Sequence, residues 1–182
     1  MEDVPSNLPA LKRFITTHDD TGKAVFSSKL CEDTPFLEIP GAAFGLGYTT
    51  KSFPADLNGD KDIAAYETAL EKPPGIVILD GSVLRFVDVG PGHFSPMHRT
   101  VSLDYGVVIE GDVSCVLDSG EERKMKRGDV TIQRGTMHAW RNNSKTEWAR
   151  IMFVLQGCKP VTVNGEELKE DLADMHGVPA SS

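Results

Sequence analysis

The chain has 182 residues, of which 40% are hydrophobic and 25% are charged, and its formal net charge is −8. This composition is typical of a single globular domain, and the negative charge without any basic cluster argues against nucleic acid or an anionic membrane as a partner. No apolar run is long enough to span a bilayer, and none follows the acidic start, so we expect no secretory signal and a cytoplasmic location. The three unclustered cysteines fit free thiols in a reducing compartment.

The N-terminal region predicts a β-hairpin. Residues 11–17 and 23–27 are short strand-like runs, and the sequence His18-Asp19-Asp20-Thr21-Gly22 between them is a good turn. Because a lone hairpin is only marginally stable, we expect it to pair with a second subunit in a homodimer.

The next region predicts one strand and one helix. Residues 42–50 form the strand; the glycines around them lack dinucleotide-loop spacing and no helix follows, so no nucleotide cofactor is expected. Residues 56–67 imitate a calcium loop, but Lys61 occupies the position where such a loop needs glycine. The alternative is a polar turn in which Asp60 or Asp62 caps a helix over residues 63–70, which Pro73 and Pro74 then terminate.

From Gly75 onward the pattern is that of β-structure. Short strands are expected at residues 76–79, 83–89, 98–104, 105–109, 113–117, 122–126, 130–133, 139–142 and 148–155, with glycine-containing turns between most of them. Such regular short strands predict a sandwich or barrel, and a jelly roll is one common form. The tail predicts a strand at 161–163, an Asn164-Gly165 turn, and a short acidic helix from Glu166 to about Met175.

Two spaced motifs lie in the middle of this β-region. The first contains Gly92, His98, Thr100, Asp104 and Gly111, and the second contains Gly128, Gln133, Gly135, His138 and Asn142. This order and spacing resemble the paired signature of the cupin superfamily. Three positions depart from it: Asp104 stands for a glutamate, Thr100 for a second histidine, and Gln133 for a proline. The spacing between Gly128 and Gln133 is also one residue shorter than in the cupin signature.

The resemblance implies an all-β cupin jelly-roll barrel with an N-terminal hairpin extension and one or two short helices. Residues 1–182 would form a single domain, with the barrel core at about 75–157. It also implies that His98, Asp104 and His138 meet inside the barrel, where they could act in catalysis or bind one divalent iron, zinc or manganese ion. A metal-bound site and a metal-free site are both left open.

Strand alternation adds candidate substrate contacts. Alternation places Thr100 on the same face as His98, with Phe94 also on that face, and it places Trp140 on the face of His138. These three side chains, Phe94, Thr100 and Trp140, are therefore expected to contact a small-molecule substrate, the aromatic ones as part of an apolar wall.

The segments 96–106 and 133–142, with 146–150 in the tail, further resemble small cupins of fungal secondary-metabolite clusters. That resemblance implies tailoring of a carbonyl-bearing, polyketide-like substrate. The leading hypothesis is lyase-type or isomerase-type chemistry, in which a histidine removes a proton next to a carbonyl group and water or carbon dioxide leaves. The alternatives are an iron-dependent oxidoreductase and a non-catalytic small-molecule-binding cupin.

Overall fold

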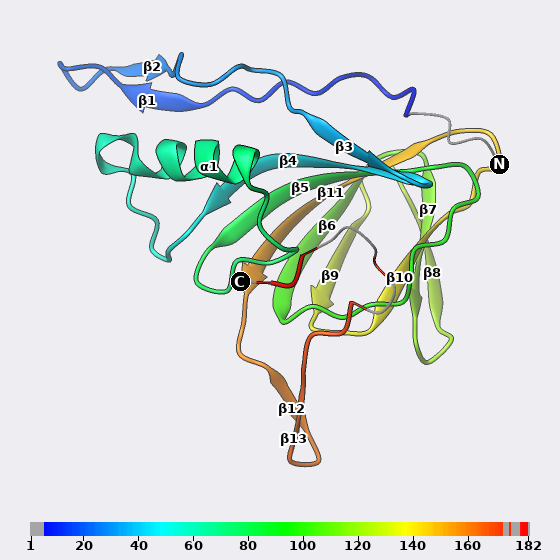
Figure 1. Cartoon of the computed structure of the whole chain (residues 1–182). Helices are drawn as coiled ribbons and strands as arrows, with labels where there is room; N and C mark the ends of the chain where they lie inside the picture. Colours follow the sequence, from blue (N-terminus) through cyan, green and yellow to red (C-terminus); the bar gives the residue numbers. More distant parts are fainter. Residues whose placement is uncertain (1–5, 173–174, 176–178, 182) are drawn as a thin grey trace.

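The computed structural model describes residues 6–172, 175 and 179–181, and two antiparallel sheets dominate it (Figure 1). The larger sheet has the order β3-β4-β5-β11-β6-β9, and the smaller has the order β10-β7-β8. The larger sheet consists of β3 (Phe36–Ile39), β4 (Ala42–Thr50), β5 (Ser82–Val89), β11 (Ala149–Gly157), β6 (Ser102–Glu110) and β9 (Val130–Arg134). The smaller consists of β10 (His138–Asn142), β7 (Asp112–Leu117) and β8 (Glu122–Lys126). This is the jelly-roll arrangement that the spaced strands and turns predict.

The core lies between the two sheets because alternation directs one set of side chains inward from each strand. On β11, Ile151, Phe153 and Leu155 are buried, whereas the alternate residues Met152 and Val154 are only partly buried. The smaller sheet contributes Val113, Cys115 and Trp140 to the same cluster. Each fully buried large apolar side chain stabilises the fold by about 1.5–3 kcal/mol, so this shared core holds the sheets together.

Backbone pairing brings the two halves of the spaced motif together. In the larger sheet, Asp104 of β6 lies opposite Gln133 of β9. Further along, His98 and His138 form an isolated antiparallel bridge, with N–H···O distances of 2.8 and 2.9 Å in the two directions. The predicted adjacency of the two motif segments is therefore confirmed.

The α-helix α1 (Lys61–Glu71) packs against β4 through Ile63, Tyr66 and Ala69, which are spaced for one helical face. The Tyr66 hydroxyl donates a hydrogen bond of 2.6 Å to the carbonyl oxygen of Leu46 in β4. None of the helices in the described part of the chain combines the length and apolar character needed to cross a membrane.

A short 3₁₀ helix, η1 (Asn58–Asp60), precedes α1, and Asp60 is the N-cap residue. Its side chain makes no capping hydrogen bond, because it accepts one from Thr17 at 2.6 Å and pairs with Lys29 at 2.9 Å. Asp56 pairs with Lys61 at 2.8 Å. Two carboxylates of the possible calcium loop are thus bound to lysines, which supports the alternative of a polar turn before a helix.

The N-terminal hairpin has the predicted position but shorter strands, β1 (Thr16–His18) and β2 (Ala24–Phe26). It lies above α1, beyond the edge of the larger sheet (Figure 1). The aromatic rings of Phe14 and Phe26 lie edge to face, 6.2 Å apart, and both side chains are more than half exposed. The hairpin therefore presents apolar surface to solvent.

The residues before this hairpin cover a buried ion pair on the larger sheet. Arg150 of β11 donates to both carboxylate oxygens of Asp88 in β5, at 2.6 and 2.7 Å. The Ser6 hydroxyl donates to Asp88 at 2.6 Å, and Arg150 donates to the Pro9 carbonyl oxygen at 2.7 Å. The chain before β1 is therefore bound to the centre of the sheet.

Three secondary-structure predictions were wrong. Residues 76–79 form no strand, although Ile76, Val77 and Ile78 are buried as an irregular loop. The expected strand at 98–104 begins only at Ser102, after isolated bridges. The tail forms a hairpin of β12 (Val161–Val163) and β13 (Glu166–Leu168) in place of the start of the expected helix, whose residues 173–174 lie outside the described part of the chain.

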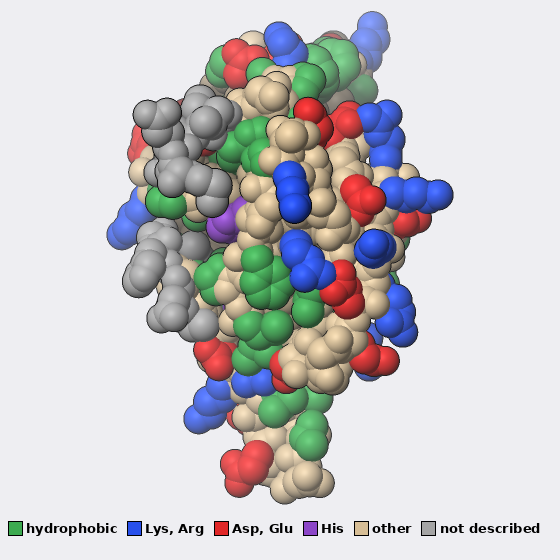
Figure 2. Space-filling view, turned by 90° about the vertical axis from the view of Figure 1, so that its right-hand side faces the viewer, with side chains coloured by type: hydrophobic (Ala, Val, Ile, Leu, Met, Phe, Trp, Pro, Cys, Tyr) green, Lys and Arg blue, Asp and Glu red, His purple; other side chains and the backbone are tan. Residues whose placement is uncertain are grey.

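The outer faces of the two sheets differ. Acidic and basic side chains are interspersed over the side of the molecule where β7, β8 and β10 lie (Figure 2). On the larger sheet, Tyr105 lies opposite Ile132, and Val107 opposite Val130, and three of these four side chains are more than 40% exposed. The larger sheet therefore has an apolar outer surface at its β6–β9 end.

Candidate functional site

A cavity of about 480 Å³ lies between the sheets, and strands of both sheets line it. Its wall is mostly apolar; the larger sheet supplies Phe44, Val87, Ile151, Phe153 and Leu155. The polar and ionisable side chains that reach it are His93, Ser95, His98, Thr100, Asp104, His138 and Arg85. A concave, mainly apolar pocket with a few converging polar groups is the usual form of a small-molecule site.

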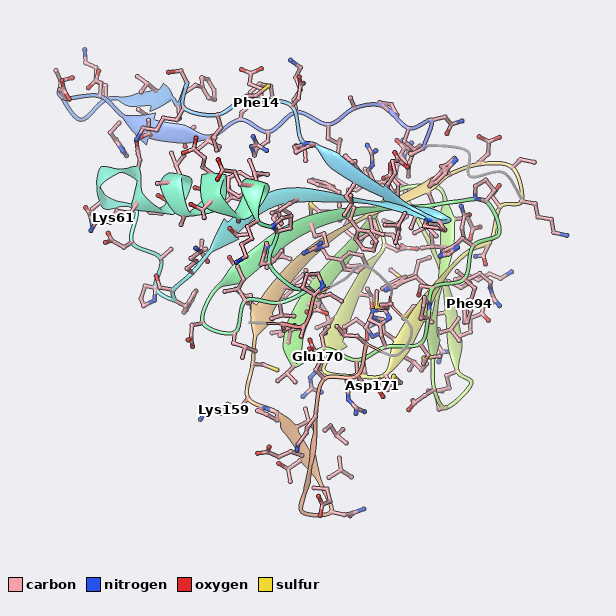
Figure 3. All side chains as sticks on the ribbon, in the orientation of Figure 1. Phe14, Lys61, Phe94, Lys159, Glu170 and Asp171 are labelled. Carbon is pink, nitrogen blue, oxygen red and sulfur yellow. The ribbon has the colours of Figure 1, made fainter. Side chains whose placement is uncertain are left out.

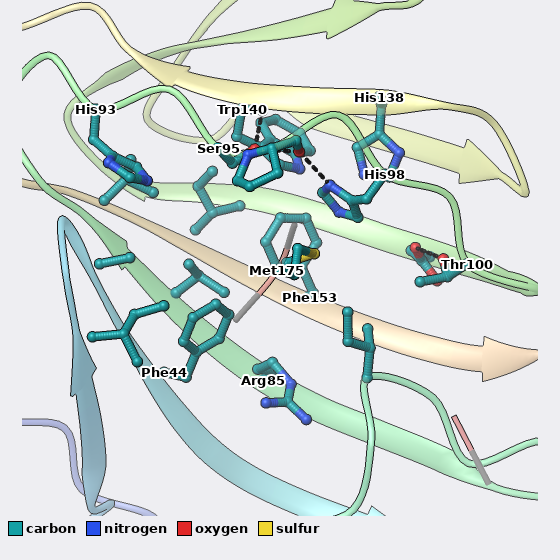
Figure 4. Close-up of a pocket in the computed structure, with 18 of the residues that line it drawn as sticks. Phe44, Arg85, His93, Ser95, His98, Thr100, His138, Trp140, Phe153 and Met175 are labelled. Atoms are coloured by element: carbon teal, nitrogen blue, oxygen red, sulfur yellow. Dashed lines mark hydrogen bonds between the residues drawn. The ribbon is translucent and has the colours of Figure 1, made fainter. Parts of the chain in front are cut away.

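His98 and His138 lie side by side at the wall of this cavity (Figure 4). Their ring centroids are 4.4 Å apart and the rings are inclined by 48°. The structure thus brings the two predicted histidines together on one cavity, as expected from the motif spacing. Their backbone bridge explains this, because residues directly opposite each other across antiparallel strands project to the same side.

Each ring is oriented by a backbone carbonyl group two residues earlier in the chain. His98 Nδ1 lies 2.9 Å from the Pro96 oxygen, and His138 Nδ1 lies 2.9 Å from the Thr136 oxygen. A carbonyl oxygen can only accept a hydrogen bond, so Nδ1 carries the proton in both rings. In a neutral imidazole, Nε2 then keeps its lone pair, which is the state that a general base or a metal ligand requires.

Burial keeps this pair neutral. It lowers the pKa of His98, although the hydrogen bond to Pro96 partly opposes the shift. Burial, together with the proximity of His98, lowers the pKa of His138 to about 4. At neutral pH both rings are therefore unprotonated at Nε2.

Asp104 lines the same cavity but has its own polar neighbours. Its Oδ2 accepts a long hydrogen bond of 3.5 Å from the Thr100 hydroxyl, which itself accepts one of 2.8 Å from Ser102. Its Oδ1 is buried and has no hydrogen-bond partner among the described residues. Burial raises the pKa of Asp104 to about 6, against the opposing effect of Ser102 and Thr100.

The described residues contain no group of three or more His, Cys, Asp or Glu side chains that could hold a metal ion. The predicted set of His98, Asp104 and His138 is therefore not assembled as three ligands around one point. An aspartate is one methylene shorter than a glutamate, which accounts for its shorter reach from β6. The two histidines fit as two ligands of a metal, since both Nε2 atoms have free lone pairs.

The predicted substrate contacts divide into two groups. Thr100 and Trp140 line the cavity, and the Trp140 ring lies 5.9 Å from that of His138 and 5.3 Å from that of Phe153. Phe94 does not line it: the side chain is 47% exposed and points outward, 5.9 Å from the Arg141 guanidinium (Figure 3). The inward position expected for Phe94 is wrong because residues 93–97 are not a regular strand and do not alternate.

Two ionisable cavity residues, His93 and Arg85, were missed by the sequence reasoning. His93 lies within the span of the first motif but at none of its signature positions, so nothing in the sequence distinguished it. Arg85 had a signal: it is the one charged side chain in the alternating set Val83, Arg85, Val87 and Val89, whose other members are apolar. A charge in an otherwise apolar, inward-facing row indicates a functional position.

Comparison with known proteins agrees with this architecture. A family model described as a cupin domain matches residues 85–155. Phomopsin biosynthesis cluster protein D of Diaporthe leptostromiformis is 50% identical over 86% of this chain and 83% of that protein. Oryzines biosynthesis cluster protein J of Aspergillus oryzae is 45% identical over 93% of this chain and 95% of that protein. Cupin-domain-containing oxidoreductase fogC of Aspergillus ruber is 44% identical over 90% of this chain and 81% of that protein. The chain therefore belongs to the cupin family, and its relatives include proteins of fungal biosynthesis clusters.

Proposed function

We propose that this protein is a tailoring enzyme of secondary metabolism that uses His98 and His138 for acid–base chemistry on a carbonyl-bearing substrate. The observation that carries the proposal is the pair of Nδ1 hydrogen bonds to backbone oxygens, which leaves the Nε2 lone pair free on each of two rings whose centroids are 4.4 Å apart. The apolar cavity suits a carbon-rich substrate. The biosynthesis-cluster names of the relatives support the setting.

The reaction begins with proton transfer. Nε2 of one histidine, which we assign to His138, takes a proton from the carbon next to the carbonyl group, and the C–H electron pair forms an enolate. The enolate then expels a hydroxyl group from the β-carbon, and the proton returns from the imidazolium to that leaving oxygen as water. If no leaving group is present, the same proton returns to another carbon and the product is an isomer.

Asp104 and Thr100 contribute to the electrostatics of this step. With its pKa raised to about 6, Asp104 exchanges a proton near neutral pH more readily than an exposed aspartate. Thr100 donates to it and keeps one oxygen oriented. We assign both as positioning groups, because their hydrogen bonds are to each other and to Ser102.

A second candidate is an iron-dependent oxidoreductase, which the oxidoreductase name of the relative from Aspergillus ruber favours. His98 and His138 would be two ligands of an iron, zinc or manganese ion, and Asp104 would have to move to complete the predicted set of three. When bound, such an ion supplies Lewis-acid polarisation of a carbonyl oxygen, and iron adds redox chemistry. The Nε2 atoms of His98 and His138 cannot serve both functions at once, because an Nε2 lone pair that binds a metal is not available as a base.

Deuterium exchange separates the candidates. Chelator-treated protein is incubated with 1-phenylbutan-1-one in D₂O, and incorporation at the carbon beside the carbonyl is followed by NMR. We expect accelerated exchange that falls by about 100-fold in His138→Gln and is unchanged in His18→Gln, a control at an exposed histidine of the hairpin.

Exchange that requires added metal and is accompanied by oxygen consumption would replace the proposal by the oxidoreductase. A third function from another class, a non-catalytic binding module, would be indicated by ligand binding that survives both histidine substitutions without any exchange.

A further inference from the structure

Arg85 is a cationic side chain in the wall of the cavity. It projects from β5, and Figure 4 shows it across the cavity from His98 and His138, with Phe153 and Met175 between them. Its guanidinium lies 5.9 Å from the centre of the Phe44 ring. The two ends of the cavity therefore differ: neutral imidazoles at one end and a guanidinium at the other.

The hydrogen-bonding capacity of this guanidinium is largely unused. Nη2 donates to the Gly75 carbonyl oxygen at 3.1 Å, and Nε is buried without a hydrogen-bond partner among the described residues. An arginine offers five N–H donors in a planar fork, so several remain available.

Among the described residues, no acidic side chain forms an ion pair with Arg85. Asp88, three residues later, is bound on the opposite face of the sheet by Arg150. Asp104 lines the same cavity, but its hydrogen bond is to Thr100 and it lies beyond ion-pair distance from Arg85. A buried cation without a counter-ion is unfavourable unless a ligand supplies the opposite charge.

We propose that Arg85 binds a carboxylate group of the substrate and so positions its carbonyl-bearing end beside His98 and His138. The inference names the substrate class of the site proposed above and rests on that function only in using the same cavity. The ligand is an amphiphilic carboxylic acid: an apolar body fills the cavity and a planar anion reaches the guanidinium.

A carboxylate is the anion that fits best. Its two oxygens accept parallel hydrogen bonds from the guanidinium fork, and such charge-assisted pairs are stronger when water is excluded. Burial lowers the pKa of Arg85 to about 10, so the side chain still carries its charge at neutral pH. Among the described residues, the neighbouring side chains that the larger sheet contributes to the cavity, such as Phe44, Val87 and Leu155, carry no charge that would compete for the carboxylate.

The test compares two probes by isothermal titration calorimetry: 4-phenylbutanoate and its neutral analogue 4-phenylbutanamide. We expect the wild-type protein to bind the carboxylate at least about tenfold more tightly. Arg85→Met, which keeps the length of the side chain without its charge, should bind both probes equally. Arg141→Met, at an arginine paired with Glu122 outside the cavity, should keep the wild-type preference.

The substitution also has a stability signature. Because Arg85→Met removes an unpaired buried charge, the variant should keep or raise the Tm in the absence of ligand. If it fails to fold, Arg85→Lys decides: it should weaken carboxylate binding and leave amide binding unchanged. Equal affinities in the wild type, failure of the carboxylate to bind at 10 mM, or a preference that persists in Arg85→Met would overturn the proposal.

The result is separable from the catalytic proposal. His138→Gln should keep the preference for the carboxylate while it loses deuterium exchange. A wild-type protein that prefers the carboxylate but shows no exchange, or a His138→Gln variant that still exchanges, would end the catalytic proposal alone. A wild-type protein that exchanges but shows no preference for the carboxylate would end the assignment of Arg85 alone.

Discussion

Replacing Asp88 by asparagine should destabilise the protein more than any surface substitution. The Asp88 and Arg150 side chains are 1% and 4% exposed and are joined by two hydrogen bonds of 2.6 and 2.7 Å. Asp88→Asn leaves the Arg150 guanidinium buried without its counter-charge, which costs about 3–5 kcal/mol of unfolding free energy. At about 2–4 °C per kcal/mol for a chain of this size, the Tm should fall by about 6–20 °C.

Urea denaturation of four proteins measures the effect: wild type, Asp88→Asn, Arg150→Met and the double variant. The double variant leaves neither charge buried without its partner. Its loss of unfolding free energy should therefore be smaller, by about 2 kcal/mol, than the sum of the losses in the two single variants. Glu32→Gln is the control, because Glu32 pairs with Lys12 at 3.4 Å with both side chains more than half exposed; it should change stability by less than about 0.5 kcal/mol. A loss below about 1 kcal/mol in Asp88→Asn, or additive single losses, would refute the reasoning.

Three further predictions concern pH, metal and assembly. The pKa of His138 is about 4 in the folded protein and about 6.5 when unfolded. As pH falls through this window the unfolded chain binds the proton first, so the wild type should lose more stability between pH 7.5 and 5 than His138→Gln; equal losses in urea titrations would contradict this. Asp104 has a raised pKa, so its protonation stabilises the folded protein as pH falls. Both proteins contain Asp104, so this contribution cancels when their losses of stability are compared. Any transition metal should occupy only part of the protein molecules, and a chelator should remove it with little change in the Tm, because the apolar core does not depend on the metal. Elemental analysis alongside a thermal melt checks this, and unfolding on chelation would contradict it. We expect a homodimer in which the N-terminal hairpin, with its exposed Phe14 and Phe26, pairs with a second subunit, so Phe26→Glu should give monomers by light scattering; a wild-type monomer at micromolar concentration would end that expectation.

The sequence was sufficient for most of the β-structure because turn residues and alternation act locally. The strand at Ala42–Thr50 begins and ends where predicted, and the Asn164-Gly165 turn has the positive φ values, 53° and 86°, that a tight hairpin requires. The same turn made the expected helix after it wrong. The turn pairs Val161–Val163 with Glu166–Leu168 in a hairpin, and this strand pairing outweighs the helix propensity of the acidic residues.

The limits of sequence reasoning show most clearly in the site. The motif spacing brought His98 and His138 together correctly, because it reflects register between two segments. It could not place Phe94, since alternation holds only within a regular strand. Arg85 was missed although it is the one charge in an apolar row of β5, because the sequence did not show that this row faces a cavity.

The hydrogen bonds of the two histidines have a consequence for how this site can change over time. Both acceptors are peptide oxygens, at Pro96 and Thr136, and every amino acid supplies the same oxygen at those positions. Side-chain replacement at the acceptor positions therefore leaves the ring protons where they are, and only a movement of the main chain would transfer them to the other nitrogen. Descendants of this protein could exchange the cavity wall for new substrates while inheriting an unchanged pair of basic nitrogens.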